Sequence, residues 1–222
     1  MSTKKLFSED AYMKECNATI TQVNKVDDRT EVMLDQTCLF AFSGGQASDF
    51  GTINDVTVES ARVSEDKTDI VYTFAEDKMP LPFKEGNQVT IKIDWDRRYK
   101  IMKLHSAAHL IYFLFAEKTG LKKLIGSNIS VDKGRLDYEM DESISPMLPE
   151  MEVQANKFLS QSHEIQTYPD EDQPNKRSWV CEEWKAPCGG THVKNTTEIG
   201  TVKLKRKNIG AGKERVEVML VE

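Results

Sequence analysis

Four residues of this chain combine metal-binding side chains with a spacing that could bring them to one ion. His105 and His109 are four positions apart in a predicted helix, so both imidazoles project from one face. Cys188 and His192 repeat that interval, and the Gly189-Gly190 pair between them lets the backbone turn. Nitrogen and sulfur ligands suit zinc better than magnesium or calcium, which prefer oxygen. The pattern predicts a zinc site held by one pair of histidines and one cysteine–histidine pair.

The neighbouring residues exclude one large class of zinc enzymes. Zinc peptidases of the HExxH type carry a glutamate directly after the first histidine as the general base, and this chain has Ser106 there. Cys181 is an alternative thiol ligand, although its place in a strand predicted around residues 178–184 favours a structural role. Four protein ligands would close the coordination sphere, whereas a catalytic zinc keeps one position for water or substrate. The sequence leaves both arrangements open.

The elements that must position these side chains divide the chain into two predicted domains. Alternating apolar and polar residues over positions 1–93 predict a small antiparallel β-barrel or sandwich. Residues 94–222 predict an α+β domain with an antiparallel sheet packed on helices at 97–118 and about 147–163. Gly120 marks the end of the first helix, and Pro149 suits the first turn of the second. We therefore predict an α+β fold with the zinc site in the second domain.

The bulk composition indicates a soluble chain with a real core. Of its 222 residues, 39% are hydrophobic and 30% are charged. The longest apolar stretch, Leu110 to Ala116, is too short to span a bilayer, and the N-terminus lacks the apolar core of a signal peptide. Four scattered cysteines argue against a disulfide scaffold. These features favour a cytoplasmic protein with no membrane partner.

Charge is distributed unevenly along the chain. The net charge of −6 argues weakly against a nucleic-acid partner. Two stretches are nevertheless basic, Asp96 to Lys103 and Lys203 to Arg215. Such runs are either solvated surface or local patches that hold a polyanion.

Several motifs together resemble one known family. HSAAHL at His105 to Leu110, CGGTHV at Cys188 to Val193 and TEIG at Thr197 to Gly200 are similar to the editing domain of alanyl-tRNA synthetases. They are still more similar to its freestanding relatives, the AlaX family of alanyl-tRNA editing proteins. FSGGQASDFG, Phe42 to Gly51, resembles the Gly-Gly-Gln loop of the medium-length members, which join an N-terminal barrel to the editing domain.

The resemblance implies a hydrolase that acts in trans on mischarged tRNA. It would remove serine, with glycine as a second candidate, from the tRNA for alanine, and DNA is not an expected partner. The family's zinc ligands correspond to His105, His109, Cys188 and His192. The loop departs from the family pattern, because Ala41 and Ala47 stand where prolines are expected and Ser43 replaces a glycine. Ser43 would be strained at any position that needs a positive φ.

The substrate implied by the resemblance is an ester between an amino acid and the terminal ribose of tRNA. A zinc ion could polarise the carbonyl and activate water, or it could position the ester for water activated elsewhere. The amides of Gly189, Gly190 and Thr191 are candidate donors to the oxyanion. Serine exceeds alanine by one hydroxyl, so a selective site must hydrogen-bond that group. Gln46, Ser127 and Thr191 are the candidates for this contact, with loop bracing as the alternative role of Gln46.

Basic residues near the chain end are the predicted tRNA contacts. As a group they should make binding weaken as salt rises, since phosphate contacts release counterions. The predicted contacts are Lys205, Arg206, Lys207, Lys213 and Arg215, followed by Arg97 and Arg98.

Two other functions fit the same residues. The editing domain of threonyl-tRNA synthetases shares the paired motifs, which would keep the chemistry and change the tRNA to that for threonine. A zinc-stabilised RNA-binding module without catalysis is the alternative from another class. The sequence does not determine an oligomeric state.

Overall fold

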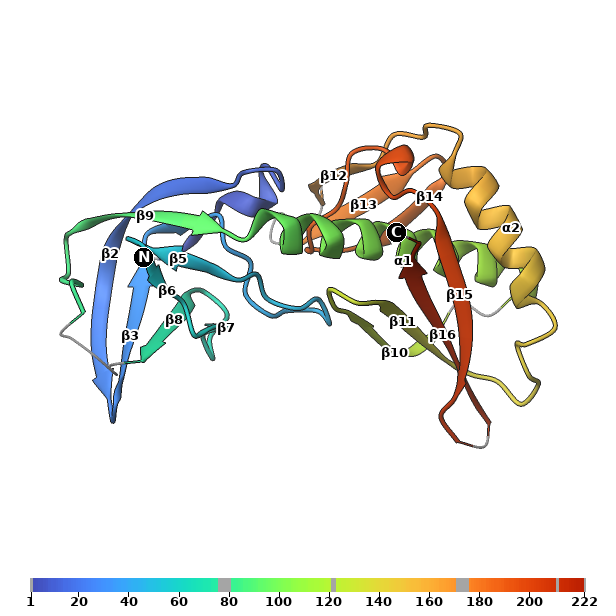
Figure 1. Ribbon diagram of the computed structural model, residues 1–222, viewed down its shortest axis with the longest axis horizontal. Coiled ribbons are helices and arrows are strands. Elements are labelled where there is room, and N and C mark those ends of the chain that lie inside the picture. The colour runs from blue at the N-terminus through green and yellow to red at the C-terminus, as the bar shows by residue number, and fades with distance from the viewer. Residues whose placement is uncertain (1, 76–80, 121–122, 171–175, 211, 222) are drawn as a thin grey trace. The chain divides into compact units, whose positions relative to one another are not determined.

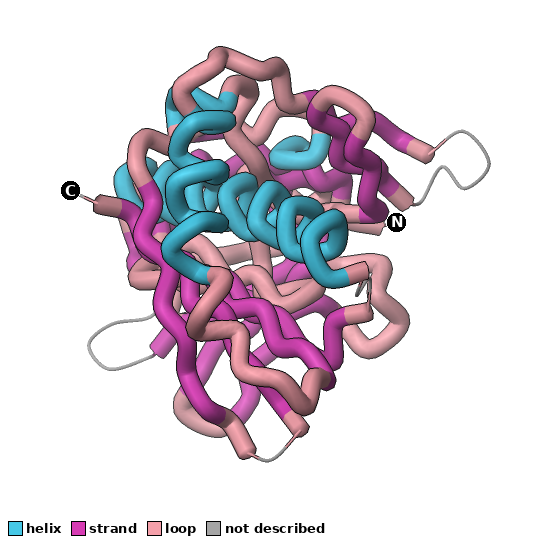
Figure 2. The backbone as a smooth tube through the Cα atoms, turned by 90° about the vertical axis from the view of Figure 1, so that its right-hand side faces the viewer, coloured by secondary structure: helices cyan, strands magenta, loops and turns pink. Residues whose placement is uncertain are grey.

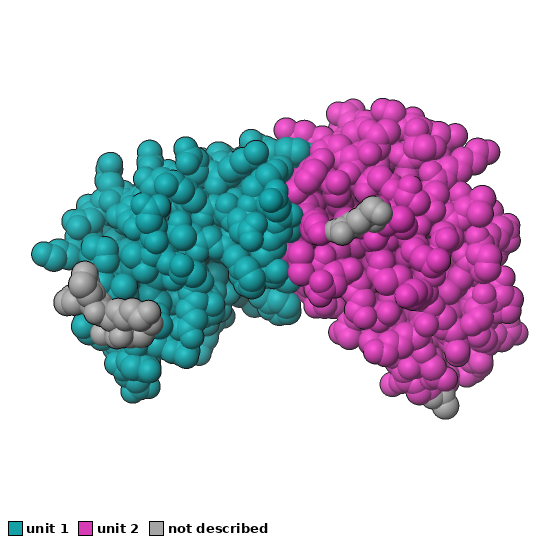
Figure 3. All heavy atoms as spheres, viewed as in Figure 1, with its two compact units in different colours: residues 1–43, 47–98 teal, residues 44–46, 99–222 magenta. Residues whose placement is uncertain are grey.

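The computed structural model describes residues 2–75, 81–120, 123–170, 176–210 and 212–221. These residues form two compact units, which Figure 3 distinguishes by colour. Unit 1 comprises Met1–Ser43 and Ala47–Arg98, and unit 2 comprises Gly44–Gln46 and Tyr99–Glu222. The division therefore falls after Arg98 rather than after residue 93. The tip of the Gly-Gly-Gln loop, predicted in the first domain, belongs to unit 2.

Strands predominate over helices in the structure (Figure 2), and the two helices α1 and α2 complete an α+β fold, as predicted. The described strands of unit 1 form a seven-stranded sheet in the order β6-β5-β9-β2-β3-β8-β7. All neighbouring strands of this sheet are antiparallel. A separate short pair, β1-β4, is parallel. No ladder among the described residues joins the edge strands β6 and β7, so closure into a barrel stays a prediction. The elements of unit 1 are β1 (Lys4–Lys5), η1 (Leu6–Ser8), β2 (Glu15–Val26), β3 (Arg29–Leu34), β4 (Gln36–Thr37), β5 (Gly51–Ile53), β6 (Val56–Thr57), β7 (Ser60–Val63), β8 (Ile70–Ala75) and β9 (Gln88–Ile93).

The core of unit 1 follows from the alternation in its strands. Ile20 of β2, Val32 of β3 and Ile91 of β9 point to the same buried face and are at most 1% exposed. Tyr72 of β8 joins this core and donates its hydroxyl proton to Thr37 Oγ1 at 2.6 Å, which satisfies the one polar atom of the ring.

Arg98 is the last residue of unit 1 and is completely buried there. Its guanidinium donates to Asp49 Oδ1 at 2.8 Å, to the carbonyl of Cys38 at 2.8 Å and to that of Ala11 at 3.0 Å. All three guanidinium nitrogens thus donate into the protein. The prediction that Arg98 contacts phosphate is wrong, because the arginine neutralises a buried carboxylate instead.

Unit 2 contains both helices and two antiparallel sheets, ordered β10-β11-β16-β15 and β12-β13-β14 (Figure 1). Its elements are α1 (Trp95–Thr119, in unit 2 from Tyr99), β10 (Leu124–Ile129), β11 (Gly134–Glu139), α2 (Leu148–Leu159), β12 (Gln166–Pro169), β13 (Arg177–Cys181), β14 (Trp184–Pro187), η2 (Thr196–Glu198), β15 (Val202–Asn208) and β16 (Lys213–Leu220). The turn between β15 and β16 contains Ala211, which lies outside the described residues.

The first helix is the scaffold of unit 2. The Asp94 carboxylate accepts the N–H of Arg97 at 3.1 Å and so satisfies one free donor of the first turn. Gly120 ends the helix with φ +75°, as the glycine signal predicted. On one side Phe113 stacks with Trp184 of β14 at 5.5 Å, and on another Phe115 stacks with Tyr138 of β11 at 4.0 Å. The helix therefore packs against both sheets of the unit.

The second predicted helix ends four residues earlier than expected. It ends at Leu159 rather than at His163 because Ser162 adopts a positive φ of +61° that no helix can continue. Asn156 holds the helix to the sheet, accepting the N–H of Val202 at 2.8 Å and donating to its carbonyl at 2.9 Å. Within the described residues, no helix is long and apolar enough to cross a membrane.

Candidate metal centre and adjoining cavity

The two predicted ligand pairs meet in unit 2. One ligand atom from each of His105, His109, Cys188 and His192 lies within 4.8 Å of the other three. The histidine pair comes from one face of α1, and the other pair comes from the turn that follows β14. Cys181 belongs to β13 and is not part of the cluster. The predicted convergence is thus confirmed for all four residues.

Hydrogen bonds determine which ring nitrogen of His105 faces the cluster. Its Nδ1 lies 2.8 Å from Gln46 Oε1, so this nitrogen carries the proton and Nε2 is left as the free lone pair. That Nε2 lies 3.5 Å from the Cys188 sulfur, and the Nε2 of His192 lies at the same distance. His109 Nε2 is buried, and none of the described residues forms a hydrogen bond with it.

These distances fit a tetrahedral zinc ion. With Zn–N of about 2.0 Å and Zn–S of about 2.3 Å, the nitrogen–sulfur edge of the tetrahedron is about 3.5 Å. Both sulfur–nitrogen distances in the cluster have that length. A cation would also give the unpaired His109 nitrogen a partner. The donor set and the two sulfur–nitrogen distances therefore fit zinc.

Burial sets the charge of the four side chains in the cluster. It lowers the pKa of His105 and His192 well below 6.5 and that of His109 to about 4. It also raises the pKa of Cys188 to about 11, against the opposing effect of the Gly190 backbone N–H. Neutral imidazoles are the form that binds metal, and a divalent cation would supply the charge that a buried thiolate needs.

Gln46 hydrogen-bonds both to a histidine of α1 and to the turn that carries Cys188 and His192. Its Oε1 accepts from His105 Nδ1 at 2.8 Å and from the backbone N–H of Thr191 at 2.9 Å. Its Nε2 donates to Thr191 Oγ1 at 2.9 Å. The amide is completely buried, so each of these bonds replaces contact with water. Gln46 thereby fixes the helix histidine and the ligand turn in one arrangement, as outer partners of metal ligands do.

The Gly-Gly-Gln segment reaches this position by pairing with β10. Gly45 accepts the N–H of Ile129 at 2.8 Å, and its φ of +84° places it in the region that favours glycine. A Cβ at Gly45 would lie 2.8 Å from the carbonyl oxygen of Ser127. Ser43 does not have a positive φ, so the replacement of glycine at this position causes no backbone strain.

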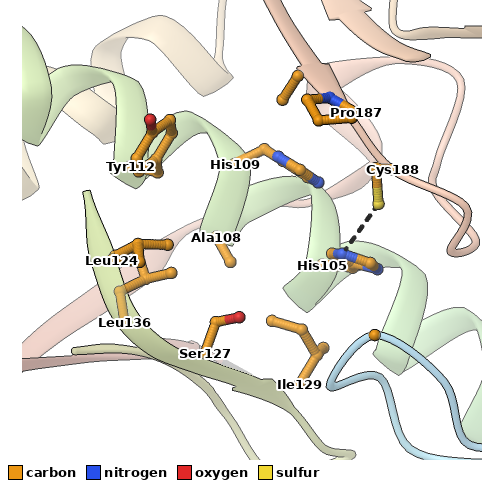
Figure 4. Close-up of a pocket in the computed structure, with 12 residues that line it drawn as sticks. His105, Ala108, His109, Tyr112, Leu124, Ser127, Ile129, Leu136, Pro187 and Cys188 are labelled. Atoms are coloured by element: carbon orange, nitrogen blue, oxygen red, sulfur yellow. Dashed lines mark hydrogen bonds between the residues drawn. The ribbon is translucent and has the colours of Figure 1, made fainter. Parts of the chain in front are cut away.

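A cavity of about 280 Å³ adjoins the cluster (Figure 4). His105 and His109 line it from α1, and Cys188 lies beside His105 at the same wall. Its remaining wall is mainly apolar and comes from Gly44, Ala108, Tyr112, Leu124, Ser127, Ile129, Leu136, Ala186 and Pro187. The hydroxyl of Ser127 points into this space.

The three residues predicted to contact the amino acid are placed differently. Ser127 lines the cavity, whereas Gln46 and Thr191 are fully buried and do not. The side chains of Gln46 and Thr191 bond to each other, which leaves neither amide nor hydroxyl directed at a substrate. These bonds are consistent with the bracing alternative for Gln46, and a catalytic role of Gln46 or Thr191 stays a prediction.

Two supporting residues were not predicted from the sequence. Trp179 of β13 stacks on His109 with ring centroids 4.7 Å apart and limits the rotation of that imidazole. The Ser106 hydroxyl accepts the N–H of Val193 at 3.2 Å and so ties the ligand turn to α1. Ser106 lies next to His105 in the HSAAH motif, which is the signal that could have indicated its role.

The predicted tRNA contacts on β15 and β16 fall into two groups. Arg206 pairs with Glu214, and Arg215 donates to Asp137 Oδ1 at 2.6 Å and Oδ2 at 2.8 Å. Lys205, Lys207 and Lys213 are exposed. Exposed Lys203 extends this row on β15 at the same alternation, so it could have been predicted with Lys205 and Lys207. The lysines remain candidate phosphate contacts, whereas the two arginines neutralise nearby acids.

Arg215→Ala is therefore expected to lower the melting temperature by several degrees. The substitution leaves Asp137, whose side chain is only 10% exposed, without its partner. Lys213→Ala is the matched control, since it removes an exposed charge two residues away and should leave stability unchanged. Thermal unfolding followed by circular dichroism measures both variants. An unchanged melting temperature for Arg215→Ala would show that this pair contributes nothing to the fold.

Gln46→Leu is expected to weaken zinc binding about 10- to 100-fold, the usual effect of losing an outer partner of a ligand. The change leaves the Thr191 N–H and the His105 Nδ1–H buried without acceptors. Competition with a chromophoric chelator measures the affinity. The exposed Gln154 of α2 provides the control Gln154→Leu, which should bind zinc like the parent protein. Equal affinities of the two variants would refute the locking role of Gln46.

Comparisons with known proteins agree over nearly the whole chain. A family model described as the threonyl and alanyl tRNA synthetase second additional domain matches residues 180–217. A second model, described as tRNA synthetases class II (A), matches residues 5–97. The first match covers the ligand turn and most of the β15–β16 hairpin, and the second covers most of unit 1.

Individual relatives extend these matches. The chain is 37% identical over 221 residues to the alanyl-tRNA editing protein AlaX-M of Pyrococcus horikoshii, with 98% of each chain covered. It is 29% identical to the AlaX-M protein of Methanosarcina acetivorans, covering 99% of this chain and all of the relative. It is also 32% identical to an alanine–tRNA ligase of Methanococcus maripaludis, of which it covers 26%.

Proposed function

The chain belongs to the AlaX family of alanyl-tRNA editing proteins, and on this basis we propose that it is a trans-acting aminoacyl-tRNA hydrolase. Its substrate is serine esterified to the tRNA for alanine, with glycine as a second mischarged amino acid. His105, His109, Cys188 and His192 hold the zinc ion on which this activity depends. The observation that carries the proposal is the cavity that opens directly onto this four-ligand cluster.

The residues around the cavity suit an ester of a small amino acid. A volume of about 280 Å³ admits an aminoacyl group and part of a ribose. The apolar part of the wall, which includes Ala108 and Leu136, excludes bulk water from that side of the cavity. Exclusion of water strengthens polar interactions at the side that carries the metal cluster. When bound, zinc would supply a positive charge that polarises the ester carbonyl or fixes the amino group of the substrate.

Neighbouring residues and burial determine the protonation state of the ligand side chains. Gln46 keeps the proton of His105 on Nδ1, so Nε2 remains unprotonated toward the cavity side. Burial holds the three imidazoles neutral at physiological pH and makes protonation of a ligand unfavourable.

Ser127 is the residue we assign to recognition of the mischarged side chain. Its hydroxyl points into an otherwise mainly apolar wall of the cavity. A hydroxyl there can bond the hydroxyl of serine, whereas the methyl group of alanine offers no partner. A site built around such a bond discriminates more strongly than an apolar pocket that only tolerates an extra hydroxyl.

The decisive experiment compares three substrates of the purified zinc-loaded protein. We expect rapid release of serine from the tRNA for alanine, little release of alanine from the same tRNA and little release of serine from the tRNA for threonine. Acid-gel or thin-layer separation of charged and free species measures each rate.

Each alternative predicts a different result in that assay. Preferential hydrolysis of seryl-tRNA for threonine would assign the chain to threonine editing. No hydrolysis above background for any of the three would leave a non-catalytic RNA-binding module. Equal loss of serine and alanine from the tRNA for alanine would contradict the selective role given to Ser127.

A further inference from the structure

The two most exposed aromatic side chains of the described residues lie close together in the sequence. Phe42 and Phe50 are each 56% exposed, and all other described aromatic residues are buried or half-buried. Both belong to unit 1, on either side of the Gly44–Gln46 segment that joins unit 2. A single exposed apolar residue needs no explanation, but two aromatic rings within nine positions do.

The backbone that carries these rings is rigidly held. Phe42 N–H donates to Ser48 Oγ at 2.8 Å, and the carbonyl of Phe50 accepts the N–H of Asp94 at 2.8 Å. Between them, Asp49 forms the buried ion pair with Arg98 that has 0% exposure on both sides. The rings are therefore displayed by a fixed support and are not the ends of a loose loop.

A cation accompanies one of the rings. The guanidinium carbon of Arg97 lies 3.8 Å above the centroid of Phe50, and its Nε donates to the carbonyl of Ser48 at 3.2 Å. Arginine stacked on an aromatic ring combines a flat apolar surface with a positive charge. Nucleic-acid bases stack on such rings while the charge attracts the phosphate between them.

The chain itself links this surface to the candidate site. Phe42 precedes Gly44 by two residues, and Gly44 lines the cavity beside the metal cluster. Two residues extend by at most about 7 Å. The backbone therefore keeps Phe42 close in the chain to a residue of the cavity wall.

From these contacts we propose that Phe42, Phe50 and Arg97 form a stacking surface for the single-stranded 3′ end of the tRNA substrate. The proposal rests on the proposed function for the identity of the RNA. The rings bind bases by stacking, and Arg97 contacts a phosphate. Because stacking depends on the aromatic face, leucine at either position should not replace phenylalanine, whereas tryptophan should.

The test measures binding separately from hydrolysis. Fluorescence anisotropy is recorded with uncharged tRNA for alanine and with the same tRNA lacking its last three nucleotides. Phe42→Leu and Phe50→Leu are each expected to weaken binding of intact tRNA about 5- to 150-fold, the range for loss of one stacked base. They should leave binding of the truncated tRNA unchanged, and Phe50→Trp should bind intact tRNA like the parent.

Val26→Ala is the matched control, because Val26 is 47% exposed in the same unit. It should not affect either tRNA. Unchanged binding of intact tRNA by both leucine variants would overturn the proposal, as would an equal loss for intact and truncated tRNA. Conversion of a dimeric parent to a monomer by these variants would also overturn it, since the surface would then join two copies of the chain.

The same measurements separate this proposal from the proposed function. Loss of binding in the leucine variants of a parent that hydrolyses none of the three esters would support the stacking surface and refute the editing activity. Normal binding in variants of a parent that hydrolyses seryl-tRNA would refute only the stacking surface.

Discussion

Cys188→Ala is expected to lower bound zinc to well below one ion per chain and to reduce hydrolysis of seryl-tRNA at least about 10³-fold. The thiol contributes the only sulfur of the cluster and lies 3.5 Å from a nitrogen of both His105 and His192. Alanine removes one of the four ligands, and with it the only thiolate that could offset the charge of a bound dication. Metal content by atomic emission and the three-substrate assay measure the two effects.

A second cysteine of the same unit provides the matched control. Cys181 is 1% exposed in β13 and is not part of the cluster, so Cys181→Ala should retain both zinc and activity. Loss of zinc with full activity in Cys188→Ala would show that the metal has a structural role only. Circular dichroism of both variants shows whether loss of activity is accompanied by unfolding, and His105→Gln tests the same site with a ligand of similar size.

Gly190→Ala is the second substitution for which we expect a large effect. A Cβ at this position would lie 2.4 Å from His105 Cε1 and 2.5 Å from Gln46 Oε1. Both neighbours are buried and bonded to each other, so neither can move away without breaking the lock between α1 and the ligand turn. We expect zinc affinity to fall by at least about 100-fold, beyond the usual range for an outer partner.

The adjacent Gly189 provides the matched control for this prediction. A Cβ at Gly189 would meet no heavy atom within 4 Å beyond its two chain neighbours, and Gly189 has no positive φ. Gly189→Ala should therefore bind zinc and hydrolyse substrate like the parent. The two variants add the same methyl group one residue apart. Equal behaviour of both variants in the chelator competition would contradict the close packing of Gly190 against His105.

The ligand identities could be predicted because they depend on local periodicity. Two histidines four apart in a helix share a face wherever that helix packs, and a Gly-Gly pair lets Cys188 and His192 converge. The helix around His105 was also predictable, because Gly120 marks its end, although it begins at Trp95, two residues before the predicted start. The family likeness followed from these same short motifs and was confirmed by relatives aligned over the whole chain.

Two other expectations failed, one because of a partner distant in sequence and one because of a local turn. Arg97 and Arg98 were predicted together as phosphate contacts. Arg98 is instead buried and donates to Asp49, whereas Arg97 stacks on the ring of Phe50. Glu182 adopts a φ of +50° in a two-residue turn, which divides a stretch predicted as one strand into β13 and β14. The place of Arg98 depends on a contact across unit 1, and the turn at Glu182 is the local reversal of the β13–β14 hairpin.

The sequence by itself indicated the four residues of the candidate metal cluster and the family to which the chain belongs. Only the tertiary structure decided what each supporting residue does. Gln46 lies 145 positions from Thr191, and no periodicity connects them, yet their hydrogen bonds hold the site together. Such long-range pairs are selected by the packing of whole elements, whereas ligand spacing is set by the geometry of a single helix or turn.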